Sequence, residues 1–161
     1  MSAVLSVCRT YRYKLARNAD IFGSKVFAYF GVNPSTADEM IDDQTVKKWL
    51  GFTKINDGKE FIVGNLFAYR ATDVTELANV DDPVGLDNDK YLAEIIKEAD
   101  VLVPCWGSRE KLPNSLHYRM DEVMDLLTNS RKTVMTFGLT ASSDPKHPLM
   151  LPYSTVLVPL N

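Results

Sequence analysis

Short, strongly apolar runs alternate with amphipathic segments along most of this chain, and this alternation constrains the fold more than any other feature. The apolar runs have the length of strands buried on both faces, and they cover residues 26–30, 61–67, 100–107 and 132–138. The segments between them place apolar side chains on one helical face, at residues 43–50, 87–99 and 115–129. This order predicts a three-layer α/β/α protein with a mostly parallel central sheet.

The N-terminal part of the chain predicts an antiparallel edge to this sheet. Residues 9–17 alternate tyrosine and leucine with basic side chains, which is typical of a half-buried strand. A polar turn at 18–24 leads directly into the run at 26–30, so we expect these two strands to form an edge hairpin. A length of 161 residues predicts a single domain over residues 1–161.

Charge and cysteine content exclude several classes of protein. The formal net charge is -3, so any binding to nucleic acid requires a local basic patch. No basic leader with an apolar core or membrane-length apolar run is present, so we expect no signal peptide and no contact with a membrane. The two cysteines, Cys8 and Cys105, form no CxxC pair, which favours a reducing compartment and a cytoplasmic protein. Cys105 lies in an apolar run and is expected to be a buried, inert thiol.

No cofactor or metal is predicted. The histidines, His117 and His147, lie far apart and have no cysteine at ligand spacing. The chain also lacks a Walker loop, a glycine-rich dinucleotide loop and a G-x-S-x-G elbow. We interpret His117, beside a helix, as structural.

The run at 26–30 ends in Gly31-Val32-Asn33-Pro34-Ser35-Thr36-Ala37-Asp38. Pro34 cannot continue a central strand and biases Asn33 toward an extended conformation. Asn33 would therefore lie at the carboxyl end of the sheet, where open α/β sheets bind ligands, with its amide available to a water or a polar ligand. The alternative interpretation is an Asx turn followed by a helix N-cap.

Other polar residues follow the remaining strands and are expected at the same edge of the sheet. Asn65 ends the second run, Ser108 follows Trp106-Gly107, and His147 lies in the loop after the last run. An asparagine amide suits the edge of a planar base, and a histidine can donate to an oxyanion. The alternatives are that Asn65 caps a loop, that Trp106 belongs to the core and that His147 lies in a surface loop.

Charged residues offer further candidates. Asp38 is a candidate base, although the acidic set Asp38, Glu39, Asp42 and Asp43 also fits loop and N-cap chemistry. The cations that could hold phosphates are Arg70, Arg109, Lys111 and Lys146, and the alternative is that they are solvated surface charges.

The chain resembles a small family from bacteria and their phages that is built around the string N-P-S-T-A-D. The matching pieces run nearly end to end and include residues 33–38, 43–45, 65–73, 82–85, 88–89, 106–107 and 146–149. This resemblance implies membership and no particular activity.

A more remote resemblance is to the uracil-DNA glycosylase superfamily. Gly31-Val32-Asn33-Pro34 resembles the asparagine form of its first motif, which implies that Asn33 positions the attacking water. By the same resemblance Asn65 reads the edge of the base, and the strand ending in Trp106-Gly107 is similar to the third strand. Lys146-His147-Pro148-Leu149 resembles a shortened version of the last motif. This resemblance implies that His147 contacts an oxygen of the base and that Leu149 inserts into the DNA duplex.

These features predict an N-glycosidic bond hydrolase, similar to a DNA glycosylase, with a glycosylase-like α/β fold. The expected partner is a nucleic acid or a nucleotide. The candidate catalytic residues are Asn33, His147 and Asp38. The candidate substrate-binding residues are Pro34, Ser35, Thr36, Asn65, Phe67, Tyr69, Arg70, Trp106, Gly107, Ser108 and Leu149.

Two other functions are compatible with the same sequence. One is a module that binds a nucleotide, a modified base or a protein on this fold without catalysis, which the acidic net charge favours. The other is a phosphodiesterase or transferase in which Asp38 and Asp43 hold a metal.

Overall fold

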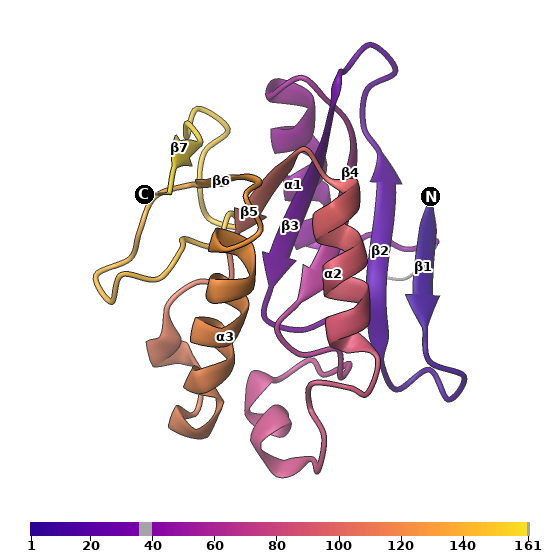
Figure 1. Ribbon diagram of the computed structural model, residues 1–161, viewed down its shortest axis with the longest axis vertical. Coiled ribbons are helices and arrows are strands. Elements are labelled where there is room, and N and C mark those ends of the chain that lie inside the picture. Colours follow the sequence, from indigo (N-terminus) through magenta and orange to yellow (C-terminus); the bar gives the residue numbers. More distant parts are fainter. Residues whose placement is uncertain (36–39, 161) are drawn as a thin grey trace.

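A computed structural model describes residues 1–35 and 40–160 of the chain, and its described strands form one seven-stranded mixed sheet in the order β1-β2-β4-β3-β5-β6-β7 (Figure 1). The strands are β1 (Ser2–Leu5), β2 (Arg12–Asn18), β3 (Lys25–Gly31), β4 (Gly58–Asn65), β5 (Val101–Pro104), β6 (Thr133–Thr136) and β7 (Val158–Pro159). The α-helices are α1 (Gln44–Ile55), α2 (Asn88–Glu98) and α3 (His117–Thr128). The predicted α/β class is therefore confirmed.

The four central strands are parallel and the two edges are antiparallel. β4, β3, β5 and β6 run in the same direction, whereas β1, β2 and β7 pair antiparallel with their neighbours. The expected mostly parallel sheet is thus correct for its four central strands, and the expected antiparallel N-terminal edge is present, whereas the antiparallel strand at the C-terminal edge was not predicted. A parallel centre brings the carboxyl ends of β3, β4 and β5 to one edge of the sheet.

The expected hairpin between the first two predicted strands is wrong. β4 lies between β2 and β3, and the N-terminal edge hairpin is formed by β1 and β2 instead. The loop from β2 to β3 itself bonds to the start of β4: the Ala19 amide donates to the Lys59 carbonyl at 2.8 Å and the Ser24 amide to the Asp57 carbonyl at 2.9 Å. Because both ends of this loop are bonded to β4, the two strands it connects cannot be adjacent.

Helices cover both faces of the sheet, which gives three layers (Figure 1). On one face α2 and α3 pack through Leu92, Ile95, Met120 and Val123. On the other face α1 packs through Trp49 and Phe52, together with Phe137 and Leu157 from the C-terminal segment. Both faces of the central strands are therefore buried, as their continuous apolar runs predict.

All three predicted helices are present, with small shifts at their ends. α1 begins after Asp43, whose carboxylate accepts from the Val46 amide at 2.9 Å, so Asp43 is the N-cap. Cys105 is buried, as expected, and burial raises the pKa of its thiol to about 12. No helix in residues 1–35 and 40–160 is long and apolar enough to cross a membrane.

Candidate functional site

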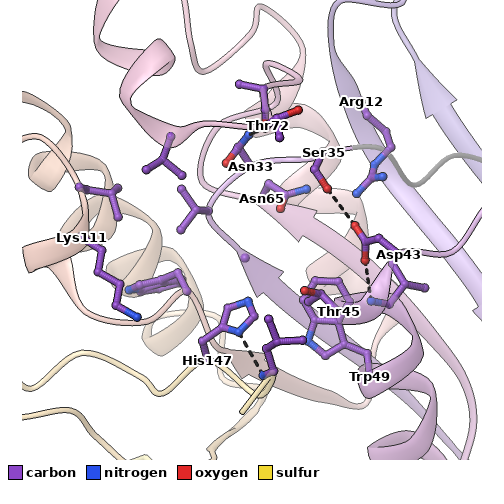
Figure 2. Close-up of a pocket in the computed structure, with 18 residues that line it drawn as sticks. Arg12, Asn33, Ser35, Asp43, Thr45, Trp49, Asn65, Thr72, Lys111 and His147 are labelled. Atoms are coloured by element: carbon purple, nitrogen blue, oxygen red, sulfur yellow. Dashed lines mark hydrogen bonds between the residues drawn. The ribbon is translucent and has the colours of Figure 1, made fainter.

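A pocket of about 360 Å³ lies where the carboxyl ends of β3 and β4 approach α1 (Figure 2). Its lining comes from segments spread over most of the chain. The lining residues are Arg12, Gly31, Val32, Asn33, Ser35, Asp43, Thr45, Val46, Trp49, Asn65, Ala71, Thr72, Val74, Trp106, Lys111, Leu112, His147 and Leu149.

Asn33 is held by its amide nitrogen. The Asn33 Nδ2 donates to the Ala71 carbonyl at 2.8 Å and to the Pro34 carbonyl at 3.0 Å. Two carbonyl acceptors on one side identify this atom as nitrogen and place Oδ1 on the other side of the amide. The Asn33 oxygen is thus the part of this amide that can accept a hydrogen bond from a ligand or a water.

Asn65 ends β4 and its backbone is fixed from two helices. The Asn88 Nδ2 of α2 donates to the Asn65 carbonyl at 3.1 Å, and the Arg119 Nε of α3 donates to the Leu66 carbonyl at 2.8 Å. The Asn65 residue is only 3 % exposed, and its side chain makes no hydrogen bond within the described part of the chain. Figure 2 shows this amide pointing into the pocket between Asn33 and Ser35. An amide that faces a pocket can accept at its oxygen and donate from its nitrogen, so it suits recognition of a polar ligand.

Gly31 lies between the side chains of Asn65 and Trp49, and its lack of a side chain leaves space between them. A Cβ at Gly31 would lie 3.2 Å from the Asn65 Oδ1 and 3.6 Å from the indole of Trp49. The Trp49 ring is itself stacked on Tyr29, with centroids 5.6 Å apart and planes at 12°. An apolar ring therefore faces a polar amide across a space that a side chain at position 31 would narrow.

His147 is presented to the pocket as a hydrogen-bond donor. The Leu149 amide donates to the His147 Nδ1 at 3.1 Å, so in the neutral ring the proton is on Nε2. Burial, together with the positive charge of Lys111, lowers the pKa of His147, and the carboxylate of Asp43 acts against them. The ring is neutral at pH 7 and its Nε2–H can donate to an oxygen or a nitrogen of a ligand.

The turn after β5 supports His147 from behind. Gly107 has a φ of +84°, a left-handed conformation that favours glycine, and a Cβ there would contact the His147 Cβ at 3.4 Å. Its amide donates to the Pro145 carbonyl at 2.8 Å. Gly107 therefore fixes the segment that carries His147.

Asp43 brings a carboxylate to the pocket besides capping α1. One of its oxygens accepts from the Val46 amide, and the other accepts from the Ser35 hydroxyl at 2.9 Å (Figure 2). The bond to Ser35 joins the loop after β3 to the start of α1. Asp43 and Ser35 thus form one polar wall of the pocket.

The predicted site residues divide into four groups. Asn33, Ser35, Asn65, Trp106, His147 and Leu149 line the pocket. Pro34 is buried beside it and supplies the carbonyl that holds Asn33. Thr36 and Asp38 lie outside the described residues.

The other predicted residues lie elsewhere. Phe67 is fully buried in the apolar core. Tyr69 and Arg70 line a second hollow next to the pocket, and Gly107 and Ser108 line another beside Lys146. Ser108 caps the short helix that follows it, since its Oγ accepts from the Glu110 amide at 3.2 Å.

Several lining residues are absent from the predicted set. The sequence rule selects polar residues that directly follow a predicted strand. It misses Arg12 in β2, Thr45 and Trp49 in α1, and Thr72 in a long loop. Asp43 was interpreted as a cap or a metal ligand, and the cap is correct. Only its position next to the N-P-S-T string could have indicated that the same carboxylate reaches the pocket.

Metal-ligating side chains are not clustered at this site. In residues 1–35 and 40–160, no group of three or more histidine, cysteine, aspartate or glutamate side chains is placed to hold a metal ion.

The fold and the site define a class: an α/β protein whose mixed sheet carries a pocket at the carboxyl ends of its parallel strands. The chain belongs to the family described as protein of unknown function, DUF1643, which matches residues 12–149. This range begins at Arg12 and ends at Leu149, so it contains every residue that lines the pocket. Comparisons with curated proteins and with solved structures give no match.

Proposed function

We propose that the pocket binds a nucleobase and that the protein hydrolyses the N-glycosidic bond joining this base to its sugar. The observation that carries the proposal is the convergence of Asn33, Asn65 and His147, from three separate segments, on one pocket walled by Trp49 and Trp106. The order of these motifs resembles that of the uracil-DNA glycosylase superfamily, and we extend the proposal to a fold of that type.

The buried amide of Asn65 supports recognition of a base edge. Its oxygen accepts and its nitrogen donates, which matches the adjacent acceptor and donor groups on the edge of a heterocycle. The space between this amide and Trp49, kept open by Gly31, suits a flat ring. A base bound there would be paired along its edge and in contact with an aromatic face.

His147 supports the departure of the base. When water attacks the sugar carbon, the carbon–nitrogen bond breaks and its electron pair leaves with the base, which becomes an anion. A neutral histidine whose Nε2–H donates to that anion stabilises the charge as it develops. The proton lost by the water passes to the departing base or to a carboxylate, so the overall reaction consumes one water.

Asn33 and Asp43 support activation of that water. The Asn33 Nδ2 is engaged with two carbonyls, so its Oδ1 is left to orient the water. Asparagine does not accept a proton, whereas the carboxylate of Asp43 in the same pocket does. We therefore assign water positioning to Asn33 and proton acceptance to Asp43.

The test is a base-release assay on single- and double-stranded DNAs that carry uracil, mismatched thymine or modified pyrimidines. We expect release from at least one substrate by the wild type and its loss in Asn33→Ala and in His147→Ala. Gly31→Ala narrows the space between Asn65 and Trp49 without removing a polar group, and it should also reduce release. Release that continues unchanged in all three variants would contradict the proposal.

Asp43→Asn separates the proposed role of Asp43 as a proton acceptor from its role as the N-cap of α1. Asparagine caps a helix about as well as aspartate, so the free energy of unfolding should change by less than about 1 kcal/mol. Base release should fall about a hundredfold or more, the usual contribution of a general base. Wild-type release rates in Asp43→Asn would exclude proton acceptance by Asp43.

A binding module without hydrolysis is the second candidate. It is favoured by the engagement of both Asp43 oxygens in structural hydrogen bonds, which leaves the site without an uncommitted base. Under this alternative the same panel of DNAs would be bound, with binding weakened in Gly31→Ala, and no base would be released.

A further inference from the structure

A second hollow, of about 450 Å³, adjoins the pocket and shares Ser35, Ala71 and Thr72 with it. Its other lining residues are Arg9, Thr10, Tyr69 and Arg70. We propose that this hollow binds a phosphate group of the substrate, with Arg9 and Arg70 as its charged donors. This inference rests on the proposed function, since it names the substrate of the same site as a nucleotide unit rather than a free nucleoside.

The two loops that carry these arginines are tied together. The Arg70 amide donates to the Thr10 carbonyl at 2.9 Å, and Tyr11 and Tyr69 form an isolated antiparallel bridge. Residues 61 positions apart in the sequence are thus brought to one place by backbone hydrogen bonds. The fold therefore sets the backbone positions from which the two arginine side chains extend.

Arg70 carries an unused buried donor. The Arg70 Nε is buried and has no hydrogen-bond partner within the described part of the chain. Its Nη1 reaches only the Arg9 carbonyl, at 3.4 Å, which is too long for a strong bond. A buried guanidinium N–H without an acceptor costs free energy, and an anion that accepts from it removes that cost.

The charge around the hollow favours an anion. Among the described residues, its lining holds two arginines and no carboxylate, although the chain as a whole has a formal net charge of -3. Asp43 lines the neighbouring pocket and is bonded to the Ser35 hydroxyl, so Ser35 is not a donor for the anion. The hydroxyls of Thr10 and Thr72 complete the set of donors, and phosphate is the anion that arginine forks and hydroxyls bind together.

The residues that line both spaces, Ser35, Ala71 and Thr72, indicate how one ligand could extend from the pocket into the hollow. With the base beside Asn65 and Trp49, the sugar would lie along Ser35 and Thr72, and the phosphate would reach Arg70. The ligand that spans both spaces is a nucleoside phosphate, either free or as one unit of a nucleic acid.

The first test observes Arg70 directly and needs no catalysis. In ¹⁵N-labelled protein the Nε–H signal of Arg70 is followed while inorganic phosphate is added, with chloride at matched ionic strength as the reference. We expect a saturable shift of this signal with phosphate only, and its phosphate affinity should be weakened several-fold in Arg9→Ala. Absence of a saturable shift in folded wild-type protein would overturn the proposal.

Arg131→Ala is the matched control for Arg9→Ala. Both arginines are exposed and both have a left-handed backbone, with φ of 60° at Arg9 and 65° at Arg131, so the two substitutions impose the same charge loss and similar strain. Arg131 lines neither space. Equal weakening of phosphate binding by both variants would show a non-specific charge effect and overturn the assignment.

The second test separates this inference from the proposed function and identifies the source of the phosphate. Its arms are the four deoxynucleoside 5′-monophosphates, the matching nucleosides and a mixed-sequence single-stranded DNA. Tighter binding of a monophosphate than of its nucleoside, lost in Arg70→Lys, supports the phosphate site, and still tighter binding of the DNA assigns it to a nucleic acid. Two results together would support the phosphate site and contradict the base pocket. Inorganic phosphate would still shift the Arg70 Nε–H signal in Gly31→Ala, and in the wild type no nucleoside monophosphate would bind more tightly than inorganic phosphate.

Discussion

At the residue scale, one type of side chain plays two roles in this site. Asn33 is fixed by two carbonyls that accept from its nitrogen, whereas the Asn65 side chain, equally polar and more deeply buried, is bonded to none of the described residues. The difference arises from the surrounding carbonyl groups, because an amide nitrogen that meets two acceptors becomes a structural group. Asn33 therefore offers a ligand only its amide oxygen, whereas Asn65 offers both its amide oxygen and its amide nitrogen.

Asn33→Asp should destabilise the protein even though it is nearly isosteric. The carboxylate would face the carbonyls of Ala71 and Pro34, replacing two donated bonds with two repulsive contacts. We expect the free energy of unfolding to fall by about 1–3 kcal/mol, measured by urea denaturation. Asn114→Asp, at an exposed asparagine, is the control and should change it by less than about 0.5 kcal/mol. Equal effects at both positions would contradict the role of Nδ2.

His147 predicts a pH dependence whose sign follows from its lowered pKa. Burial and Lys111 hold the pKa of His147 below its ordinary value of 6.5, so the unfolded chain binds this proton before the folded protein does. Wild-type stability should therefore fall, relative to His147→Gln, as the pH drops from about 6.5 through the folded pKa, and should not differ in pH dependence above that range. Urea denaturation of both proteins across this range checks it, and parallel curves would refute it.

At the element scale, the site depends on how closely the helices approach the sheet. α1 carries Trp49 to one wall and is capped by Asp43, and α2 holds the end of β4 through Asn88. Gly64 in β4 makes the second approach possible, because a Cβ there would lie 2.8 Å from the Leu92 Cδ2 and 3.1 Å from the Ile95 Cδ1. The glycine is needed for packing and not for an unusual backbone angle.

Gly64→Ala should accordingly push α2 away from the sheet. We expect a loss of about 1–3 kcal/mol in the free energy of unfolding, the usual cost of overpacking. In a double variant with Leu92→Ala, the added methyl occupies vacated space, so the combined loss should be smaller than the sum of the single losses. Additive losses, measured by urea denaturation, would show that the methyl does not meet Leu92.

At the scale of the whole molecule, one buried cation links the two helices of a layer to the sheet. Arg119 of α3 is 3 % exposed, donates to the Leu66 carbonyl after β4 and pairs with Asp89 of α2 and Glu122. These bonds connect elements that are distant in the sequence and meet directly behind Asn65. The position of that amide therefore depends on the packing of α2, α3 and β4 together.

Arg119→Met should weaken this link while keeping most of the packed volume. Loss of the charged donor leaves the Leu66 carbonyl with weaker pairing, and we expect a loss of about 1–3 kcal/mol in the free energy of unfolding. Arg131→Met, at an exposed arginine, should stay within about 0.5 kcal/mol under the same urea denaturation. A similar small change in both variants would show that Arg119 does not stabilise the fold.

Local sequence patterns identified some of the residues that line the pocket. Asn33, Asn65, Trp106 and His147 could be selected because each follows a strand, and parallel strands share a carboxyl edge. Phe67 was selected by the same rule, but its side chain is buried in the core cluster with Leu92 and Leu116 and does not line the pocket. The strand-end rule indicates where a residue lies along the sheet and does not indicate the direction of its side chain.

The α/β class, the three helices, the four central strands and the edge at which polar residues gather all follow from the amino-acid sequence. They depend on periodicity and turn residues, which are local. The folded structure is needed to show that β4 lies between β2 and β3, that Asp43 and Trp49 line the same pocket as Asn65, and that Arg9 and Arg70 share a hollow. Each of those is a meeting of distant segments, whose free energy depends on packing and hydrogen bonds that no local pattern contains.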